Sequence, residues 1–325
     1  MRILITLFLL VALAAGGWWA WAVYVPVTPP GNQSVLLRSG YSTRRIAIEL
    51  KRAGVIHSVF AFRVWHELHP KLSLKAGEYL FDRQASMRQV HDRIARGDVY
   101  FHVVTIPEGY TMFDIAKAME AAGLGSAQDF LKITNRTELI SDLAPEAKSL
   151  EGYLFPSTYQ FTRTQSREEM VGAMVRQFRQ VAQQIGLNSD VHRTVTMASI
   201  VEKETASPDE RPMVASVYYN RLAHRVTLDA DPSVIYALLL VGNFSGSLHH
   251  ADLGIESPYN TYRFRGLPPG PIGNPGQSSL TAAMHPANTD FFYFVSDGNG
   301  HHRFARDLAE HNRNVAAYRR ALGMR

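Results

Sequence analysis

An uncharged apolar stretch at the start of the chain limits the possible folds more than any other feature. From Ile3 to Val25 there is no charged residue, and roughly 20 apolar residues are enough to cross a bilayer as a helix. Arg2 precedes this stretch, and three Trp residues with Tyr24 close it, at the end where aromatic rings favour the membrane interface. We therefore predict one membrane anchor over residues 1–25, with the N-terminus in the cytoplasm and the rest of the chain outside.

The alternative to a retained anchor is a cleaved signal peptide. Ala12-Leu13-Ala14 has the small-residue pattern of a cleavage site. The apolar run continues well past these residues and ends in the Trp cluster, which favours retention.

Composition excludes several classes of function. The 325 residues are 46% hydrophobic and 19% charged, which fits two or three globular domains. The absence of Cys excludes disulfides, Cys-type zinc sites and thiol nucleophiles. The net charge of +5 would suit an anionic partner, but no Lys/Arg run tracks a phosphate backbone, so nucleic acid is not expected.

Turn residues and apolar spacing indicate the elements that follow the anchor. Residues 26–34 (PVTPPGNQS) predict a short stiff linker. Strands are predicted at residues 78–81 and 101–106, and helices at 87–94, from Ser166 to Gly186, and at 194–205. Asp231-Pro232 predicts a helix start with Asp231 as the N-cap and Pro at the first position. Asp297-Gly298-Asn299-Gly300 predicts a hairpin, followed by a polar helix from Asp307.

A short internal repeat links two of these regions. Residues 40–47 (GYSTRRIA) align with residues 109–116 (GYTMFDIA), and Leu50 aligns with Met119. Each copy has a Gly turn, a Ser or Thr able to cap a helix, and apolar residues at helical spacing. The alternative explanation is two unrelated capped helices.

Glu204 is the strongest candidate for acid–base chemistry. On a helix it shares a face with Met197, Ile200 and Val201, at a position where the pattern calls for an apolar residue. Burial against an apolar wall raises the pKa of a carboxyl, as a general acid requires near neutral pH. The alternative is a helix end that emerges into solvent.

Two further patterns are less specific. Residues 257–276 combine aromatic rings, amides and a stiff Gly/Pro backbone, which suits either sugar binding or a rigid surface loop. The pairs His249-His250 and His301-His302 do not favour a metal site, because adjacent side chains point apart.

Nine motifs follow one another along the chain: TIPEGYT (105–111), EGYLFPSTY (151–159), ASIVEKET (198–205), SVYYNRL (216–222), DPSVIYAL (231–238), SPYNTYRFRGLPPGPIGNPG (257–276), AAMHPA (282–287), FYFVSDGNGHHRF (292–304) and EHN (310–312). Through these motifs the chain resembles the YceG-like family of endolytic peptidoglycan (murein) transglycosylases over nearly its full length. One departure is Ser157, where the family usually has Asp, so no role for that carboxylate carries over.

The resemblance implies an α+β architecture in four parts. These are a transmembrane anchor (1–25), a linker (26–34), a small LysM-like α+β module within a substrate-binding region (35–145), and a larger, mainly helical catalytic domain with a short β-sheet (146–325). It also implies an anchor in the bacterial inner membrane, a periplasmic catalytic domain, and no cofactor or metal. Candidate partners are peptidoglycan strands, membrane lipid, and peptidoglycan synthases or divisome and elongasome proteins.

The resemblance makes Glu204 the single catalytic residue. Protonated Glu204 would donate to the glycosidic oxygen between N-acetylmuramic acid (MurNAc) and N-acetylglucosamine (GlcNAc), then act as base on the muramic C6 hydroxyl, giving a 1,6-anhydro end. This internal nucleophile replaces the second carboxylate of ordinary glycosidases. The alternatives are a hydrolytic muramidase, in which Glu202 or Asp231 would hold water, and a non-catalytic wall-binding scaffold.

Five residues are candidates for glycan contacts. They are Glu108, Glu210, Asp231, Asn260 and Tyr262. Each could instead cap a helix or tether a loop, and for Asp231 before Pro232 a helix cap is the simpler interpretation.

Overall fold

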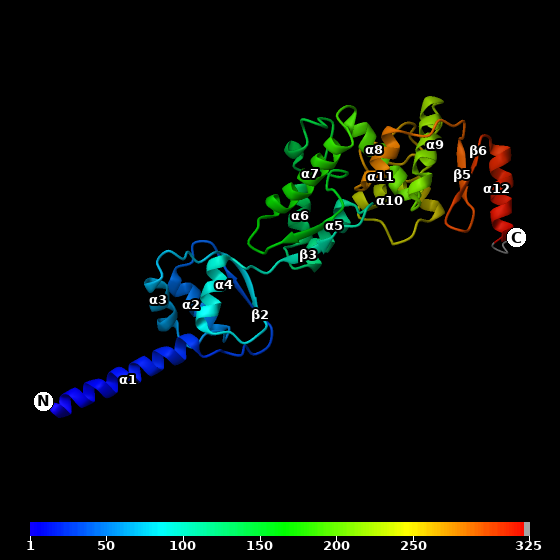
Figure 1. Ribbon diagram of the computed structural model, residues 1–325. Helices are drawn as coiled ribbons and strands as arrows, with labels where there is room; N and C mark the ends of the chain where they lie inside the picture. The colour runs from blue at the N-terminus through cyan, green and yellow to red at the C-terminus, as the bar shows by residue number, and fades with distance from the viewer. Residues whose placement is uncertain (322–325) are drawn as a thin grey trace. The chain divides into compact units, whose positions relative to one another are not determined.

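A computed structural model describes residues 1–321 as a mixture of helices and three small two-stranded sheets (Figure 1). The chain divides into two compact units, residues 1–103 with 160–166, and residues 104–159 with 167 onward. The expected mixed α and β composition is confirmed. The LysM-like identity of the small module and the four-part division into domains stay predictions.

The first unit begins with the predicted apolar helix. It contains α1 (Arg2–Tyr24), β1 (Gln33–Leu37), α2 (Thr43–Arg52), α3 (Val59–Leu68), β2 (Gly77–Phe81) and α4 (Met87–Arg96). Strands β1 and β2 are antiparallel, with Val35 opposite Tyr79. Most of α1 is exposed apolar surface, as a membrane span would be, and the helix is long and apolar enough to cross a bilayer.

The end of α1 and the segment after it belong to this unit's core. Ala22 and Val23 are fully buried, and the Trp21 ring lies 4.1 Å from that of His57. Val27 exchanges both backbone hydrogen bonds with Ala85, at 2.9 and 3.1 Å. The segment that the sequence predicted to be a stiff linker is therefore tied to the module by backbone pairing.

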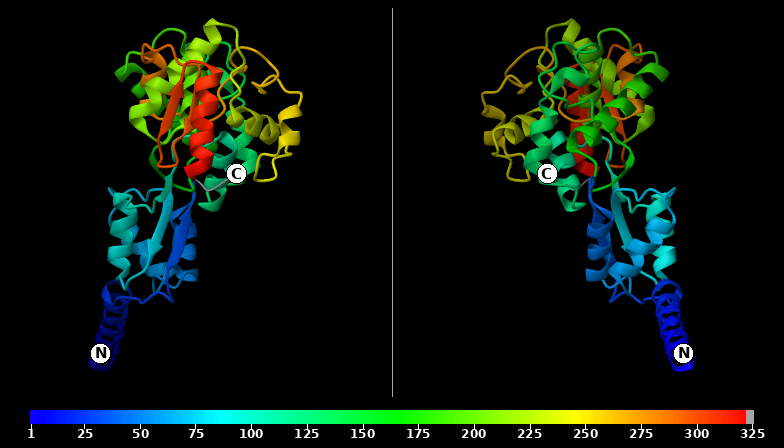
Figure 2. Two further views of the ribbon diagram at one scale, coloured as in Figure 1. Left: turned by 90° about the vertical axis from the view of Figure 1, so that its right-hand side faces the viewer. Right: turned by 90° about the vertical axis from the view of Figure 1, so that its left-hand side faces the viewer.

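The second unit is mainly helical. Its helices are α5 (Met112–Ala121), α6 (Ala127–Thr134), α7 (Arg167–Gln184), α8 (Val191–Glu204), α9 (Arg211–Ala223), α10 (Asp231–Leu240), α11 (Gln277–Met284) and α12 (Leu308–Ala321). Strands β5 (Tyr293–Ser296) and β6 (His302–Ala305) form the predicted antiparallel hairpin. Helix α12 lies beside this hairpin in both views of Figure 2. Strands β3 (His102–Thr105) and β4 (Thr158–Phe161) form the third sheet, and the division between the units falls within both strands.

The internal repeat corresponds to a repeated local structure. Ser42 caps α2 and Thr111 caps α5, each by accepting a hydrogen bond from the third helical N–H. The preceding glycines, Gly40 and Gly109, have φ of 83° and 76°, a left-handed conformation that favours glycine. Aligned positions are buried in both helices: Ile46, Ala47 and Leu50 in α2, and Ile115, Ala116 and Met119 in α5.

The equivalence extends beyond the aligned sequence. Each capped helix leads through a left-handed glycine into a second Ser-capped helix, α3 after Ser58 and α6 after Ser126. Phe62 and Phe130 are buried at matching positions of these second helices. Both copies are thus strand–helix–helix units, β1-α2-α3 and β3-α5-α6, which two unrelated capped helices would not produce.

Candidate active site

Helix α8 carries Glu204 at its last turn. Met197, Ile200 and Val201 are completely buried on the same face, and Glu204 is partly buried at the end of that face. The predicted helical face is confirmed. The carbonyl groups at the helix C-terminus also disfavour a carboxylate there, because the helix dipole is negative at that end.

The surroundings of Glu204 favour its protonated form. Burial raises the pKa of Glu204 to about 7, and the negative charge of Asp231 adds to the rise. The hydroxyl of Tyr218 donates a hydrogen bond to the Glu204 carboxyl, which, together with the positive charge of Arg221, limits the increase. A carboxyl with a pKa near neutrality can give a proton and take one back at the same pH.

Glu204 lies in a pocket of 340 Å³. This volume is within the range of small-ligand sites. Besides α8, five segments of the second unit supply the wall: α9, the start of α10 with the residues before it, the loop that carries Tyr262, strand β5 and helix α12. The residues that line the pocket with Glu204 are Tyr218, Arg221, Leu228, Asp229, Asp231, Tyr262, Tyr293, Phe294, Leu308 and His311.

Asp231 lies in this pocket and is not a helix cap. Ala230 is the N-cap of α10 and no side chain caps it, so the predicted N-cap role of Asp231 is wrong. The hydroxyl of Tyr262 donates to Asp231 Oδ1 at 2.6 Å. The pair brings a carboxylate and an aromatic ring to the pocket beside Glu204, a combination that suits sugar hydroxyls and ring faces.

Arg221 holds the pocket wall together. Its guanidinium donates to the carbonyl oxygens of Phe292, Thr227 and Leu228 at 2.7 to 3.1 Å, and pairs with Asp229 at 2.9 Å. It also lies 5.1 Å from the centre of the Tyr293 ring. One buried cation thereby links α9, the loop before α10 and the β5 hairpin.

His311 contributes a neutral imidazole to the same pocket. Burial and the charge of Arg221 lower the pKa of His311. Its ring stacks on Tyr293 with centres 5.1 Å apart. Among residues 1–321, the buried Nδ1 of His311 has no hydrogen-bond partner.

Three of the five residues expected to contact glycan are engaged elsewhere in the unit. Glu210 accepts hydrogen bonds from the backbone and ring of His302 at 2.9 and 2.8 Å. Asn260 is fully buried and donates to the carbonyl oxygens of Leu253 and Ile255. Glu108 is half-exposed and lies 3.5 Å from Arg211, outside the Glu204 pocket.

The adjacent residues His301 and His302, at the start of β6, do not point apart as the sequence suggested. His301 Nδ1 lies 3.3 Å from Glu210 and His302 Nδ1 lies 2.8 Å from the same carboxylate. Both rings therefore converge on one acidic group. Within the described residues, no group of three or more His, Asp or Glu side chains has an arrangement suited to a metal ion.

Two other carboxyls with raised pKa values are internal to the structure. Burial raises the pKa of Glu202, which accepts from Arg211 at 2.8 Å and from the backbone of Gly276 at 2.9 Å. Burial raises the pKa of Glu151 to about 8, and this carboxyl is enclosed by Met112 and Asn274. Neither lines the Glu204 pocket.

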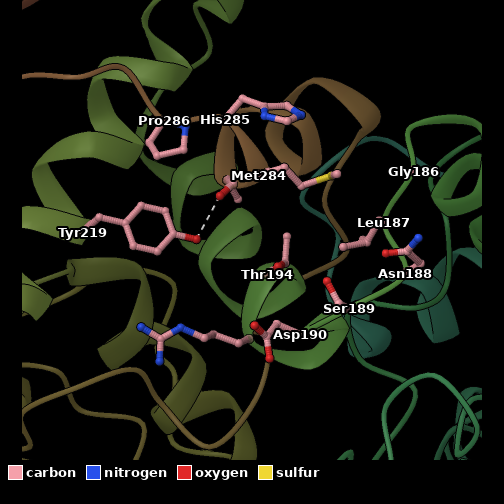
Figure 3. A pocket seen from close by; sticks show the side chains of 12 residues that line it. Gly186, Leu187, Asn188, Ser189, Asp190, Thr194, Tyr219, Met284, His285 and Pro286 are labelled. Atoms are coloured by element: carbon pink, nitrogen blue, oxygen red, sulfur yellow. Dashed lines mark hydrogen bonds between the residues drawn. The ribbon is translucent and has the colours of Figure 1, made fainter.

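A separate hollow lies at the other end of α8. Figure 3 shows Asp190, Thr194 and Tyr219 around it, and the Tyr219 hydroxyl donates to the Ala283 carbonyl at 2.8 Å. The 14 residues of α8 separate this hollow from Glu204 by about 20 Å. It therefore takes no direct part in Glu204 chemistry.

Most residues of the pocket wall were not predicted from the sequence to lie near Glu204. Tyr218, Arg221, Tyr293 and His311 occur in motifs of the resemblance, but no helical or strand pattern links them to Glu204. They come from three elements spread over roughly 100 residues, and only the packing of α9, β5 and α12 brings them together.

The fold and site together define a class: mixed α and β proteins in which one partly buried carboxylic acid, set among aromatic and acidic side chains, is protonated near neutral pH. The chain belongs to the YceG-like family, whose sequence profile matches residues 35–317.

Several relatives are similar over most of the chain. A Bacillus subtilis (strain 168) protein named endolytic murein transglycosylase is 34% identical over 88% of this chain and 84% of its own length. A protein of the same name from Streptococcus pneumoniae (strain D39) is 29% identical over 96% of this chain, which spans 64% of that relative. The crystal structure of a yceG-like protein from Listeria monocytogenes matches with a TM-score of 0.57 and 33% identity, over 87% of this chain and 98% of that one.

Proposed function

We propose that the chain is a lytic transglycosylase that cleaves the MurNAc–GlcNAc bond inside peptidoglycan strands, with Glu204 as its catalytic residue. The observation that carries this proposal is the position of Glu204 in the aromatic pocket with a pKa of about 7. The names of the Bacillus and Streptococcus relatives support peptidoglycan as the substrate.

In the proposed reaction Glu204 gives up one proton and receives another, so it ends in its starting state. The protonated Glu204 carboxyl donates to the bridging oxygen as the bond from this oxygen to muramic C1 breaks. The resulting carboxylate accepts the proton of the muramic C6 hydroxyl, and O6 bonds to C1. The products are a GlcNAc hydroxyl end and a 1,6-anhydro-MurNAc end, Glu204 is again protonated, and no water is consumed.

Asp231 and Tyr262 are the glycan contacts that we propose at this pocket, because both line it and their hydroxyl–carboxylate bond orients them. We propose that Glu108, Glu210 and Asn260 act by holding the surrounding loops and hairpin, since their side chains are engaged there.

A hydrolytic muramidase is the second candidate, because Asp231 is another carboxylate in the pocket. Its oxygen would have to hold the attacking water. The bond that Tyr262 donates to Asp231 at 2.6 Å occupies one carboxylate lone pair, which favours a positioning role over a base.

The test is product analysis of peptidoglycan digested by the purified protein. We expect 1,6-anhydro-MurNAc ends from the wild type and a loss of about 10²- to 10⁴-fold in rate for Glu204→Gln, since this variant lacks the acid and the base. Glu138→Gln removes an exposed carboxylate outside the pocket and is the matched control.

The products separate the alternatives. Reducing ends without anhydro ends would identify a hydrolase. Unchanged cellular function of Glu204→Gln would instead support a non-catalytic wall-binding scaffold.

We further propose that α1 anchors the enzyme in the inner membrane with its catalytic unit in the periplasm. The length and apolar surface of α1 support an anchor. An anchored enzyme reaches only glycan near the membrane, where strands are made, so it would terminate or release nascent strands. Synthases that work at the same place are then natural partners.

A further inference from the structure

A second cavity, of 620 Å³, lies next to the catalytic pocket in the same unit. One face of α10 forms its apolar wall, through Pro232, Ile235, Tyr236 and Leu239 at helical spacing. Phe244, just beyond α10, adds a partly exposed aromatic ring. We call this cavity the lysine pocket, because Lys117 of α5 and Lys203 of α8 also line it.

At two places, consecutive residues line the two different pockets. On α8, Lys203 lines the lysine pocket and Glu204 the catalytic pocket. On α10, Asp231 lines the catalytic pocket and Pro232 the lysine pocket. Consecutive Cα atoms are about 3.8 Å apart. The two pockets therefore border the same two stretches of backbone, at the end of α8 and at the start of α10.

Neither Lys117 nor Lys203 makes an ion pair within the described part of the chain, although the charge of Lys203 acts on the buried Glu151 carboxyl and opposes the rise of its pKa. Asp114 also lines this cavity, but its carboxylate is used to cap α5, where Oδ2 accepts from the Thr111 backbone at 3.0 Å and from the Thr111 hydroxyl at 2.7 Å.

Two glycines leave room for the Lys203 side chain. This side chain runs over Gly109 and Gly273, where an added Cβ would lie 3.7 Å from Lys203 Cδ and 3.3 Å from Cε, respectively. A Cβ at Gly273 would also lie 2.9 Å from the Gly109 carbonyl oxygen. These glycines leave a channel along which the lysine reaches the pocket.

The charges of the lysine pocket do not match a bare sugar chain. Within a peptide-bearing strand the GlcNAc and MurNAc units are uncharged, because the lactyl carboxyl of MurNAc is joined to the peptide as an amide. The remaining carboxylates are on the peptide stem, which also has methyl and methylene groups. The stem begins on C3 of muramic acid, two ring atoms from C1, so it starts close to the bond that Glu204 would cleave.

We propose that the lysine pocket binds the peptide stem of the muramoyl residue held at Glu204, with Lys117 and Lys203 pairing with stem carboxylates and α10 packing against its alkyl groups. This inference rests on the proposed function. It makes the enzyme selective for strands that still carry peptides.

Binding to the inactive Glu204→Gln protein tests the inference apart from catalysis. The ligands are a GlcNAc–MurNAc disaccharide with a tetrapeptide stem, the same compound with its stem carboxylates amidated, and the disaccharide without peptide. We expect the free-acid stem compound to bind about 10-fold more tightly than the other two, since two charge pairs are formed.

Lys117→Met is the decisive variant because Lys117 is exposed and far from Glu204 in sequence. It should lose about 5-fold in affinity for the free-acid stem compound and leave the other two ligands unchanged. Lys117→Arg, which keeps the charge, should restore at least part of the affinity. Lys148→Met removes another exposed lysine outside both pockets and should change nothing.

Equal affinities for the three ligands, or the same loss for all of them in Lys117→Met, would overturn the inference. Failure of the proposed function is distinguishable, because it would be seen in the products of the wild-type enzyme and not in these affinities.

Discussion

Asp231 and Tyr218 shift the pKa of Glu204 in opposite directions. Burial of Glu204 and the Asp231 charge raise its pKa, whereas the Tyr218 hydroxyl stabilises the carboxylate. Tyr218 is itself buried, and burial with the adjacent Glu204 raises its own pKa well above 10. It therefore remains a hydrogen-bond donor to Glu204 throughout the neutral range.

Tyr218→Phe should move the pH profile of cleavage. The proposed reaction requires protonated Glu204, so kcat/KM should fall as pH rises through the pKa of about 7. Removing the hydroxyl removes an interaction that lowers this pKa, so the alkaline limb should shift to higher pH. The measurement is kcat/KM between pH 5 and 9, and each pKa unit corresponds to about 1.4 kcal/mol.

Tyr219→Phe is the matched control for this shift. The Tyr219 hydroxyl donates to the Ala283 carbonyl and lies outside the Glu204 pocket. Its loss should leave the alkaline limb in place. A shift toward lower pH in Tyr218→Phe, or an equal shift in both variants, would contradict the role assigned to Tyr218.

Among the elements, three segments meet at the buried carboxyl of Glu151. It accepts from the first backbone N–H of α5 at 3.0 Å and from Asn274 at 2.7 Å, and it bonds to Tyr236 of α10. Asn274 also bonds to the Tyr110 carbonyl. This connection fixes α5 and α10, which carry two sides of the lysine pocket, to the loop that ends at Gly276.

The pKa of Glu151 makes this connection sensitive to pH. Folded protein keeps the proton up to a pKa of about 8, whereas the unfolded chain loses it near 4.5. The folded state thus binds more protons between these values, and stability falls as pH rises through the window, by up to about 1.4 kcal/mol per pH unit.

Glu151→Gln should remove that decline while keeping an acceptor for Met112 and Asn274. Both proteins compared should carry Glu204→Gln, because Glu204 produces a decline of the same sign up to about pH 7. Urea unfolding at pH 5, 6.5 and 8 gives the measurement. An identical pH dependence with and without Glu151 would show that this carboxyl is not protonated in the folded state.

The sequence predicted many elements because their signals are local. The apolar face that ends at Glu204, the Asp297–Gly300 turn and the capped start of α5 each depend on residues within one or two turns of chain. Asp231 shows the limit of such signals. Asp before Pro is a sound N-cap pattern, but the side chain is taken by Tyr262, 31 residues later in the chain.

The pocket wall required long-range information that periodicity does not carry. Arg221 bonds to Phe292 across 71 residues, and Tyr262 bonds to Asp231 across 31. No spacing rule connects such pairs. The motifs containing these residues could be identified from the sequence, but their side-chain partners could not.

For the molecule as a whole, helix α1 packs into the first unit as part of one structure. Besides Ala22 and Val23, which are fully buried, Trp19 packs against the same core. The Tyr24 ring contacts Trp65 of α3 at 6.1 Å. Since Val27 also pairs with Ala85, the module is held directly at the end of α1 and not on a free tether.

Two truncations should separate the anchoring role of α1 from its packing role. A chain that begins at Trp18 lacks most of the apolar helix but keeps Trp19, Ala22 and Val23, whereas one that begins at Pro26 loses all three. Both should leave the membrane fraction. Only the shorter chain should be destabilised, by roughly 2–4 kcal/mol, because burying an aliphatic side chain such as Val stabilises by about 1.5–3 kcal/mol. Denaturant unfolding followed by tryptophan fluorescence measures the difference, because all four Trp residues belong to the first unit. Equal midpoints would show that the last turns of α1 do not stabilise the module. Retention of the Trp18 chain on membranes would show that α1 is not the sole anchor.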